Sequence, residues 1–202
     1  MILPYDQSSV KQAAEIVSRG GVIAFRTDTF YGLGANPFDV AALRRIKELK
    51  GREETKPILI LVSDRDQVQR FIDQPSLEFE RLAAEFWPGP LTLIGAARSE
   101  VPHELTAGTG TIGIRLPADD DVRNLVRTCG GALTATSANP SSQPAARTAE
   151  EVAACFSSGI DLIIDGGQSR SDQPSTVLDV TGSEIKIVRE GAISTSDIRH
   201  RS

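Results

Sequence analysis

A chain of 202 residues suits one well-cored domain, and its formal net charge of −5 excludes a surface that is basic throughout, so any site for a polyanion must be a local patch. Two cysteines and two histidines are too few for a disulfide framework and give little support to zinc or histidine-based chemistry. No apolar run reaches the length of a membrane span and no export signal is evident, so the expected compartment is the cytoplasm.

The N-terminal part of the chain predicts a helix, a strand and a polar loop. A Ser9–Gln12 capping box opens an amphipathic helix over residues 9–19, and residues 22–25 form a short apolar run typical of a buried strand. Residues 26–34 then bring two threonines, one aspartate and two glycines to the end of that strand. Ligands collect at strand ends in open α/β sheets, and glycine allows close backbone approach. We interpret this stretch as a candidate binding loop, while a plain polar turn explains it equally well when it is taken alone.

A basic patch follows the loop. A helix is predicted over residues 39–50, and an apolar strand, buried on both faces, over residues 58–62. Between Arg44 and Lys56, six Lys or Arg side chains stand against three Glu. Cations at a helix C-terminus can simply complement the macrodipole. That alternative accounts poorly for Arg52 and Lys56, which lie beyond the helix, and both residue types are common phosphate ligands.

The middle of the chain contributes one arginine that needs explaining. Helices are predicted over residues 64–72 and 76–86, and strands over residues 91–94 and from Thr111 to Arg115. Arg115 lies on a strand that otherwise has the pattern of a core element, so its guanidinium group requires a partner. A structural carboxylate and an anionic ligand are equally compatible with the sequence.

The C-terminal part predicts further helices and strands and a second polar loop. The helices cover residues 120–128 and 148–156, and the strands begin at residue 132 and cover residues 161–164, 175–180 and 184–189. The loop that runs to residue 144 is dense in hydroxyl groups, which could bind a ligand or hydrogen-bond to the loop itself. Strands interleaved with helices, without a clean βαβ repeat, predict a single α/β domain over residues 1–202 with a twisted, mixed parallel and antiparallel sheet flanked by helices.

These features together indicate a class of chemistry. The chain has neither a Walker loop nor a dinucleotide-binding glycine fingerprint. Hydroxyl-rich strand ends and cations on separate elements suit a small-molecule substrate held beside a polyphosphate. In displacement at phosphorus, positioning and charge neutralisation supply most of the catalysis. The residues alone therefore predict an α/β protein that handles anions and phosphates.

Six motifs, each weak alone, occur in the same order as in a known family. They are Thr27-Asp-Thr29-Phe-Tyr-Gly-Leu-Gly34, Lys50-Gly-Arg52 with Lys56-Pro57, Phe86-Trp-Pro-Gly-Pro-Leu-Thr92, Gly113-Ile-Arg115-Leu-Pro117, Ser137-Ala-Asn139, and Ser175-Thr-Val-Leu-Asp179 with Val188-Arg-Glu-Gly191. In these motifs the chain resembles the YrdC-like threonylcarbamoyl-AMP synthases, in their short, single-domain form. The resemblance covers nearly the whole chain and implies one α/β domain with a concave, locally basic face.

The resemblance also implies an activity. Members of the family are nucleotidyltransferases that condense L-threonine, bicarbonate and ATP into threonylcarbamoyl-AMP and pyrophosphate. A separate transferase then modifies adenosine 37 of tRNA to t6A, and Mg²⁺ is expected with ATP, although no residue can be named as its ligand. The alternative is a non-catalytic module that binds double-stranded RNA or tRNA. Weak RNA binding is also expected of the enzyme, and a less favoured alternative is similar chemistry on another amino acid.

Roles for individual residues follow from the resemblance alone. The implied threonine-binding residues are Thr29, Arg115 and Ala135, the implied catalytic residues are Lys50 and Arg52, and the implied ATP-binding residues are Arg52, Lys56, Thr111, Ser137, Asn139, Ala145 and Arg189. Lys50, Arg52 and Lys56 together resemble the family's triphosphate grip. The chain departs from the residues usual in the family at four positions: Arg26, Leu61, Ser142 and Ala145. These departures bear on the details of the implied threonine-binding and ATP-binding pockets.

Overall fold

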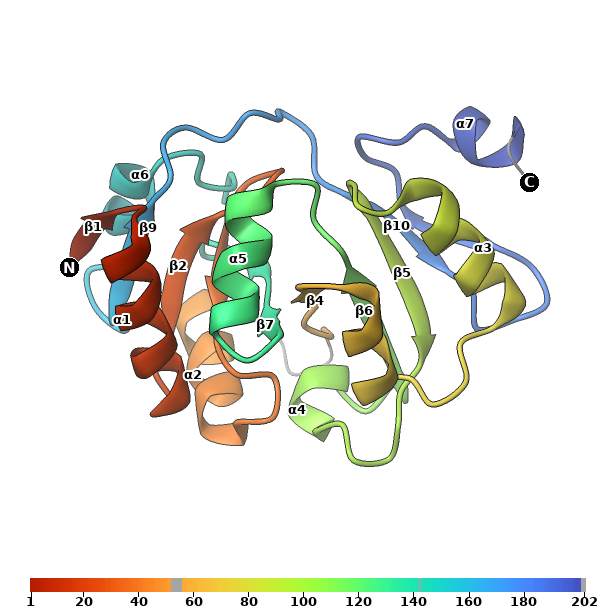
Figure 1. Cartoon of the computed structure of the whole chain (residues 1–202), viewed down its shortest axis with the longest axis horizontal. Helices are drawn as coiled ribbons and strands as arrows, with labels where there is room; N and C mark the ends of the chain where they lie inside the picture. The colour runs from red at the N-terminus through yellow and green to blue at the C-terminus, as the bar shows by residue number, and fades with distance from the viewer. Residues whose placement is uncertain (52–55, 142, 201–202) are drawn as a thin grey trace.

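The computed structural model describes residues 1–51, 56–141 and 143–200, and it confirms the predicted α/β class (Figure 1). The strands are divided between two mixed sheets, where the sequence predicted one. The helical elements are α1 (Gln7–Ser18), α2 (Val40–Lys50), the 3₁₀ helix η1 (Arg65–Arg70), α3 (Leu77–Phe86), α4 (His103–Thr106), α5 (Asp120–Thr128), α6 (Ala149–Cys155) and α7 (Thr195–His200).

Each sheet combines parallel and antiparallel pairs. The first has the order β1-β9-β2-β3-β8, and the second has the order β11-β10-β5-β6-β4-β7. The strands of the first sheet are β1 (Ile2–Pro4), β9 (Leu162–Asp165), β2 (Ile23–Arg26), β3 (Tyr31–Gly34) and β8 (Thr136–Ser137). The strands of the second sheet are β11 (Lys186–Arg189), β10 (Thr176–Asp179), β5 (Leu91–Ala96), β6 (Thr111–Arg115), β4 (Ile60–Val62) and β7 (Ala132–Thr134).

The two sheets meet where β7 passes into β8. Only Ala135 separates these strands, so the chain leaves the second sheet and enters the first at this residue. Its amide donates to the carbonyl of Leu59 at 2.8 Å, and the hydroxyl of Thr134 accepts from the amide of Ala35 at 2.9 Å. These bonds join β7 to backbone on both sides of the junction. We call this region the seam.

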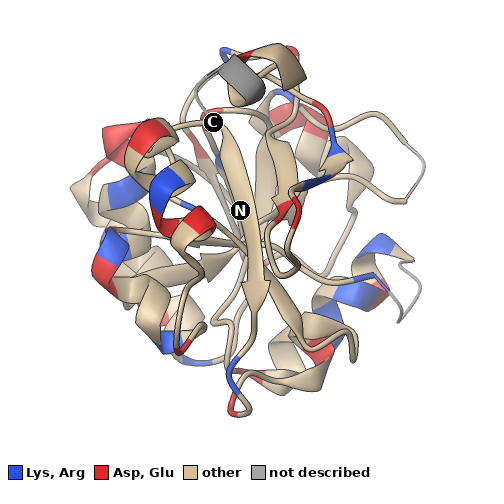
Figure 2. Cartoon of the chain, turned by 90° about the vertical axis from the view of Figure 1, so that its right-hand side faces the viewer, with Lys and Arg blue, Asp and Glu red and all other residues tan. Residues whose placement is uncertain are grey.

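Helices cover the sheets and leave the charged groups outside. In Figure 1, α1 and α5 lie side by side against the strands, and α3 packs on β5 at the other end of the molecule. Figure 2 shows that Lys, Arg, Asp and Glu gather on helices and loops, whereas the central strands carry few of them. A charged side chain that does lie on a buried strand is therefore an exception, and Arg115 on β6 is one.

Two local predictions in the N-terminal part of the chain differ from the structure. The first helix begins with Asp6 as its N-cap rather than with a Ser9–Gln12 capping box, because the Asp6 carboxylate accepts the Ser9 amide at 2.8 Å and the Ser9 hydroxyl accepts the Asp6 amide at 3.0 Å. The second difference is the length of the polar loop after β2. Residues 31–34 form β3, antiparallel to β2, and a Cβ atom at Gly34 would lie only 2.6 Å from the Phe25 ring.

Candidate active site

A cavity of ≈ 330 Å³ opens at the seam. Both sheets contribute to it, through the β2–β3 hairpin of the first sheet and through β4, β5, β6 and β11 of the second. The β7–β8 crossing, the loop after it and the connection from β9 to β10 complete the wall. Seven residues that the resemblance implied line this cavity: Thr29, Arg115, Ala135, Ser137, Asn139, Ala145 and Arg189.

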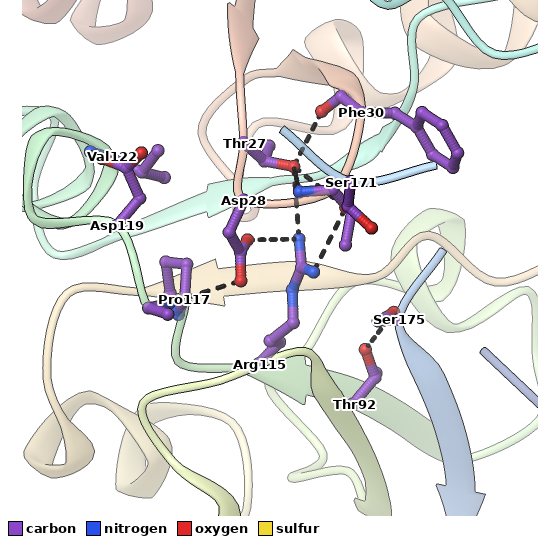
Figure 3. Close-up of polar contacts among 12 residues, drawn as sticks. Thr27, Asp28, Phe30, Thr92, Arg115, Pro117, Asp119, Val122, Ser171 and Ser175 are labelled. Carbon is purple, nitrogen blue, oxygen red and sulfur yellow. Dashed lines mark hydrogen bonds and ion pairs between the residues drawn. The ribbon is translucent and has the colours of Figure 1, made fainter. Parts of the chain in front are cut away.

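Arg115 lines the cavity from β6 and has a carboxylate partner (Figure 3). The residue is 5% exposed, and its Nη2 atom lies 3.3 Å from Oδ1 of Asp28. Burial lowers the pKa of the Arg115 guanidinium group, and the charge of Asp28 opposes that shift. The Asp28 carboxylate also accepts the amide of Ala118 at 3.3 Å, which fixes it on the side of the guanidinium group away from the cavity lining. Arg115 thus has a structural partner and still faces a site for an anion.

Two threonine hydroxyls lie beside the same guanidinium group. Nη1 of Arg115 donates to Oγ1 of Thr29 at 3.3 Å and Nη2 to Oγ1 of Thr27 at 3.5 Å. The Thr27 hydroxyl donates to the carbonyl of Phe30 at 2.7 Å and accepts the amide of Thr29 at 3.1 Å. Its single proton is therefore committed to the backbone. The Thr29 hydroxyl is 3.0 Å from that of Thr27, and it is the one whose proton can turn toward a ligand.

A second guanidinium group, from Arg189 on β11, enters the cavity opposite the hairpin. Its Nε and Nη2 atoms donate to the Ser175 carbonyl at 3.0 and 2.8 Å, and Nη2 also donates to the Ser175 hydroxyl at 2.9 Å. That hydroxyl lies 2.9 Å from the hydroxyl of Thr92. Burial lowers the pKa of Arg189, and the positive charge of Arg115 lowers it further. Two guanidinium groups in one small cavity repel each other, so a bound anion is favoured there.

Three of the predicted ATP-binding residues, Ser137, Asn139 and Ala145, lie in β8 or in the loop after it. The Asn139 side-chain amide donates to the carbonyls of Pro140 at 3.1 Å and Gln143 at 2.5 Å, which holds the loop in a tight turn. Lys50, at the end of α2, does not line the cavity but reaches the same turn, with Nζ 2.7 Å from the Asn139 carbonyl. The structure therefore brings the Lys50 ammonium group to Ser137 and Asn139, two residues that line the cavity.

Besides Lys50, two implied residues of the described part of the chain do not line the cavity, and a third lies outside the described residues. Thr111 lies at the start of β6, where its hydroxyl is 2.9 Å from that of Thr109, and it is not a lining residue. Lys56 is exposed at the point where the description of the chain resumes. Arg52, implied both as catalytic and as an ATP ligand, lies outside the described residues, as does Ser142. The roles of all three implied residues remain predictions.

Sequence reasoning from residue types missed some cavity residues. Thr92 and Ser175 entered only as members of longer motifs, yet both line the cavity and both are almost fully buried. The available signal was one hydroxyl in an apolar strand, since a buried hydroxyl needs a hydrogen-bond partner. Asp28 was noted only as one polar residue of the loop, and the structure shows that it is the ion-pair partner of Arg115.

The described residues offer neither a metal-binding cluster nor a membrane-spanning helix. No three His, Cys, Asp or Glu side chains among them form a cluster that could hold a metal ion. None of the described helices is both long and apolar enough to cross a membrane.

Comparison with known proteins identifies the family. The Sua5/YciO/YrdC family model, described as "Telomere recombination", matches residues 15–191. The chain is 36% identical over 193 residues to threonylcarbamoyl-AMP synthase of Pyrococcus abyssi and 36% identical over 167 residues to the protein of the same name from Thiobacillus denitrificans. These matches cover 96% and 83% of this chain, but 57% of the first relative and 88% of the second.

Solved structures agree with the family match. The P. abyssi Sua5 structure complexed with L-threonine superposes with a TM-score of 0.96 at 35% identity, covering 100% of this chain and 60% of that one. Escherichia coli YciO superposes with a TM-score of 0.85 at 28% identity, covering 98% and 96%. The resemblance predicted from the six motifs is confirmed, and the chain belongs to the Sua5/YciO/YrdC family.

Proposed function

We propose that this chain is a threonylcarbamoyl-AMP synthase, which condenses L-threonine, bicarbonate and ATP into threonylcarbamoyl-AMP and pyrophosphate. The observation that carries the proposal is a pair of guanidinium groups that line one hydroxyl-rich cavity, Arg115 from the buried strand β6 and Arg189 from the exposed strand β11. All three substrates are anions or carry a carboxylate, so a cavity with this charge suits them. The names of the relatives and the L-threonine complex of the P. abyssi protein support the same assignment.

Threonine would bind at the hairpin end of the cavity. The Arg115 guanidinium group is oriented by Asp28 and would pair with the amino-acid carboxylate, since Arg matches the planar geometry of a carboxylate. The Thr29 hydroxyl, whose proton can turn toward a ligand, would donate to the same substrate. Ala135, at the seam, would limit the space beside it.

ATP would bind at the other end, along the loop after the seam. Ser137, Asn139 and Ala145 line that end, and Lys56 with Arg52 would neutralise the triphosphate. Among the described residues that line the cavity there is no carboxylate, which fits an arrangement in which Mg²⁺ arrives with ATP and keeps several of its waters. When bound with ATP, Mg²⁺ would neutralise charge on the phosphate oxygens.

The reaction would proceed in two bond-forming steps. The uncharged amine of threonine attacks the carbon of bicarbonate, and loss of water leaves a threonine carbamate. A carbamate oxygen then attacks the α-phosphorus of ATP, and pyrophosphate leaves with the electron pair of the broken P–O bond. Arg115 and Arg189 would neutralise the charge of the anionic reactants and hold them close together. Such positioning and charge neutralisation lower the barrier to both steps.

The proposed product defines what must consume it. Threonylcarbamoyl-AMP is an activated mixed anhydride, so a transferase has to accept the threonylcarbamoyl group, and we propose adenosine 37 of tRNA as the eventual acceptor. The proposed compartment is the cytoplasm, where ATP and tRNA are available. Binding of tRNA by this chain itself is not required by the scheme.

The decisive experiment measures pyrophosphate release from ATP by the purified chain. Release should require both threonine and bicarbonate, should be weaker with serine, and should approach background with valine, because a site that hydrogen-bonds a hydroxyl discriminates against an isostere without one. Release that ignores bicarbonate, or equal release with valine, would overturn the assignment. Salt-dependent binding of double-stranded RNA without ATP turnover would instead favour the RNA-binding alternative.

A further inference from the structure

Lys50 has the environment of a structural cation rather than that of a ligand-binding one. The residue is 5% exposed, and its ammonium group donates to the carbonyls of Ser137 and, at 2.7 Å, of Asn139. The side-chain oxygens of the same two residues, Oδ1 of Asn139 and Oγ of Ser137, lie 3.4 and 3.5 Å away. Four oxygens from one three-residue segment thus surround a single ammonium group.

The backbone of Lys50 holds the same loop. Its carbonyl accepts the amide of Ser141 at 2.8 Å. A lysine ammonium group has three protons and no acceptor capacity, and its burial is costly unless those protons are hydrogen-bonded. Here two carbonyls and two side-chain oxygens of Ser137 and Asn139 accept them, and in return the ammonium group holds together carbonyls whose dipoles would otherwise repel one another. The turn therefore depends on Lys50 as much as Lys50 depends on the turn.

We propose that Lys50 is a positioning residue that holds the Ser137–Asn139 turn in the shape that receives the nucleotide. In this assignment its ammonium group acts through the loop, whereas Arg52 and Lys56 act on the phosphates directly. The inference deepens the proposed function and rests on it for the identity of the nucleotide. The contacts that carry it belong to the described residues and do not depend on the reaction.

A lysine that contacts a phosphate and a lysine that holds the turn predict different results when the ammonium group is removed. If Lys50 contacted a phosphate, its loss would weaken ATP binding and leave the ligand-free loop unchanged. If it holds the turn, its loss will loosen the loop before any nucleotide is present. Threonine affinity should change little in either case, because Thr29, in the loop between β2 and β3, and Arg115, on β6, belong to other elements of the cavity wall.

The test is hydrogen exchange of the backbone amides of Ala138, Asn139 and Ser141 in the ligand-free protein; Pro140 between them has no amide proton. Lys50→Met keeps the aliphatic stem and removes the ammonium group, so exchange in this segment should accelerate by about 10-fold or more, as local opening becomes easier. Lys47→Met is the matched control, because Lys47 is a buried lysine one turn earlier on α2. Exchange of the same amides should be unchanged in that variant.

Binding measurements on the same proteins complete the test. ATP affinity should fall in Lys50→Met while threonine affinity holds, and Lys50→Gln, which retains two N–H donors, should give intermediate exchange and affinity. Lys50→Gln also serves if Lys50→Met does not fold. Wild-type exchange rates in a folded Lys50→Met protein would overturn the inference, and weaker ATP binding in that same protein would indicate a direct phosphate contact instead. Failure of pyrophosphate release in the wild-type chain would refute the proposed function but not the exchange result.

Discussion

The two ends of the cavity are built differently. At the hairpin end, Arg115 lies on β6 and Thr29 lies in the loop between β2 and β3. Before any ligand arrives, Arg115 is paired with Asp28 and the Thr29 hydroxyl is hydrogen-bonded to that of Thr27. At the loop end, Ser137 closes the two-residue strand β8 and Asn139 lies in the loop after it, and one lysine from α2 donates to the carbonyls of both. The first end is preorganised by the sheets, and the second depends on side chains that reach across loops. We expect loss of the Arg115–Asp28 ion pair at the first end to affect stability and binding together, and substitutions at the second end to affect binding and turnover with little change in stability.

Loss of the Arg115 side chain tests the first end most severely. Arg115→Met should lower kcat/KM for threonine by on the order of 10³-fold, because the substrate carboxylate and Asp28 both lose their cationic partner. The same substitution should destabilise the fold by about 3–5 kcal/mol, since the buried Asp28 carboxylate is left uncompensated. Kinetics and urea unfolding of one preparation measure both effects.

A conservative variant at the same position separates the two contributions. Arg115→Lys keeps the charge beside Asp28 but replaces a planar, two-pronged donor by a point charge. It should therefore raise the threonine KM substantially while leaving the melting temperature close to that of the wild type. A lower melting temperature with an unchanged threonine KM would show that Arg115 is a structural ion pair only. In that case the hairpin end would lose its role in substrate binding.

The loop end is tested by the cations that the resemblance implied. Arg52→Ala should reduce turnover by roughly 10²-fold, as expected for the loss of one preorganised electrostatic contact to a reacting phosphate, and Lys56→Ala should also reduce it. Threonine affinity measured without ATP should hold, and ATP affinity should fall and become less sensitive to salt. Wild-type pyrophosphate release from Arg52→Ala would remove Arg52 from the phosphate grip.

The same contrast explains what could be predicted from the sequence. Apolar runs and helix caps located most elements, for example the α2 N-cap at Asp39, because they depend on local periodicity and backbone hydrogen bonds. The 3₁₀ form of η1 and the short strands β1 and β8 were missed, because pairing with distant strands decides such elements. The ligand site could also be predicted, because polar residues at the ends of strands meet at one edge of a sheet.

Which side chains contact one another at the site could not be predicted from the sequence. The pairing of Arg115 with Asp28 joins residues 87 positions apart in the chain (115 − 28), and the sequence left a carboxylate partner and a ligand equally open. The carbonyl cage around Lys50 involves backbone atoms, which leave no trace in residue type. Basic charge near residues 44–56 was visible, but whether a given cation faces phosphate or holds a loop depends on tertiary structure.

The two threonines of the hairpin end provide a finer test. Thr29→Val should raise the threonine KM by roughly 10-fold, the size of one lost hydrogen bond, with little loss of stability. Thr27→Val should do the reverse and destabilise the fold by about 1–3 kcal/mol, because the Phe30 carbonyl and the Thr29 amide lose a buried partner. The same effect from both substitutions would mean that the two hydroxyls share one role.

The smallest effect belongs to a site remote from both ends. Asp161 accepts the Val22 amide at 2.8 Å and pairs with Arg45 at 2.9 Å, at the end of β2 away from the hairpin. Burial raises the pKa of Asp161, but the hydrogen bonds from Arg45 and Val22 outweigh it and lower the pKa overall. The carboxylate therefore adds stability above its unfolded pKa of about 3.9 and loses that contribution as the pH falls through the lowered folded value.

Asp161→Asn should consequently cost a few tenths of a kcal/mol at pH 7, a small value because the side chain is partly exposed and screened. The corresponding fall in melting temperature, about 1–2 °C, should shrink toward zero when the melts are repeated below pH 3. The KM values for threonine and ATP should match those of the wild type, because neither end of the cavity is touched. A changed KM in this variant would mean that any loss of stability alters substrate binding. The KM values could then no longer distinguish the two ends of the cavity.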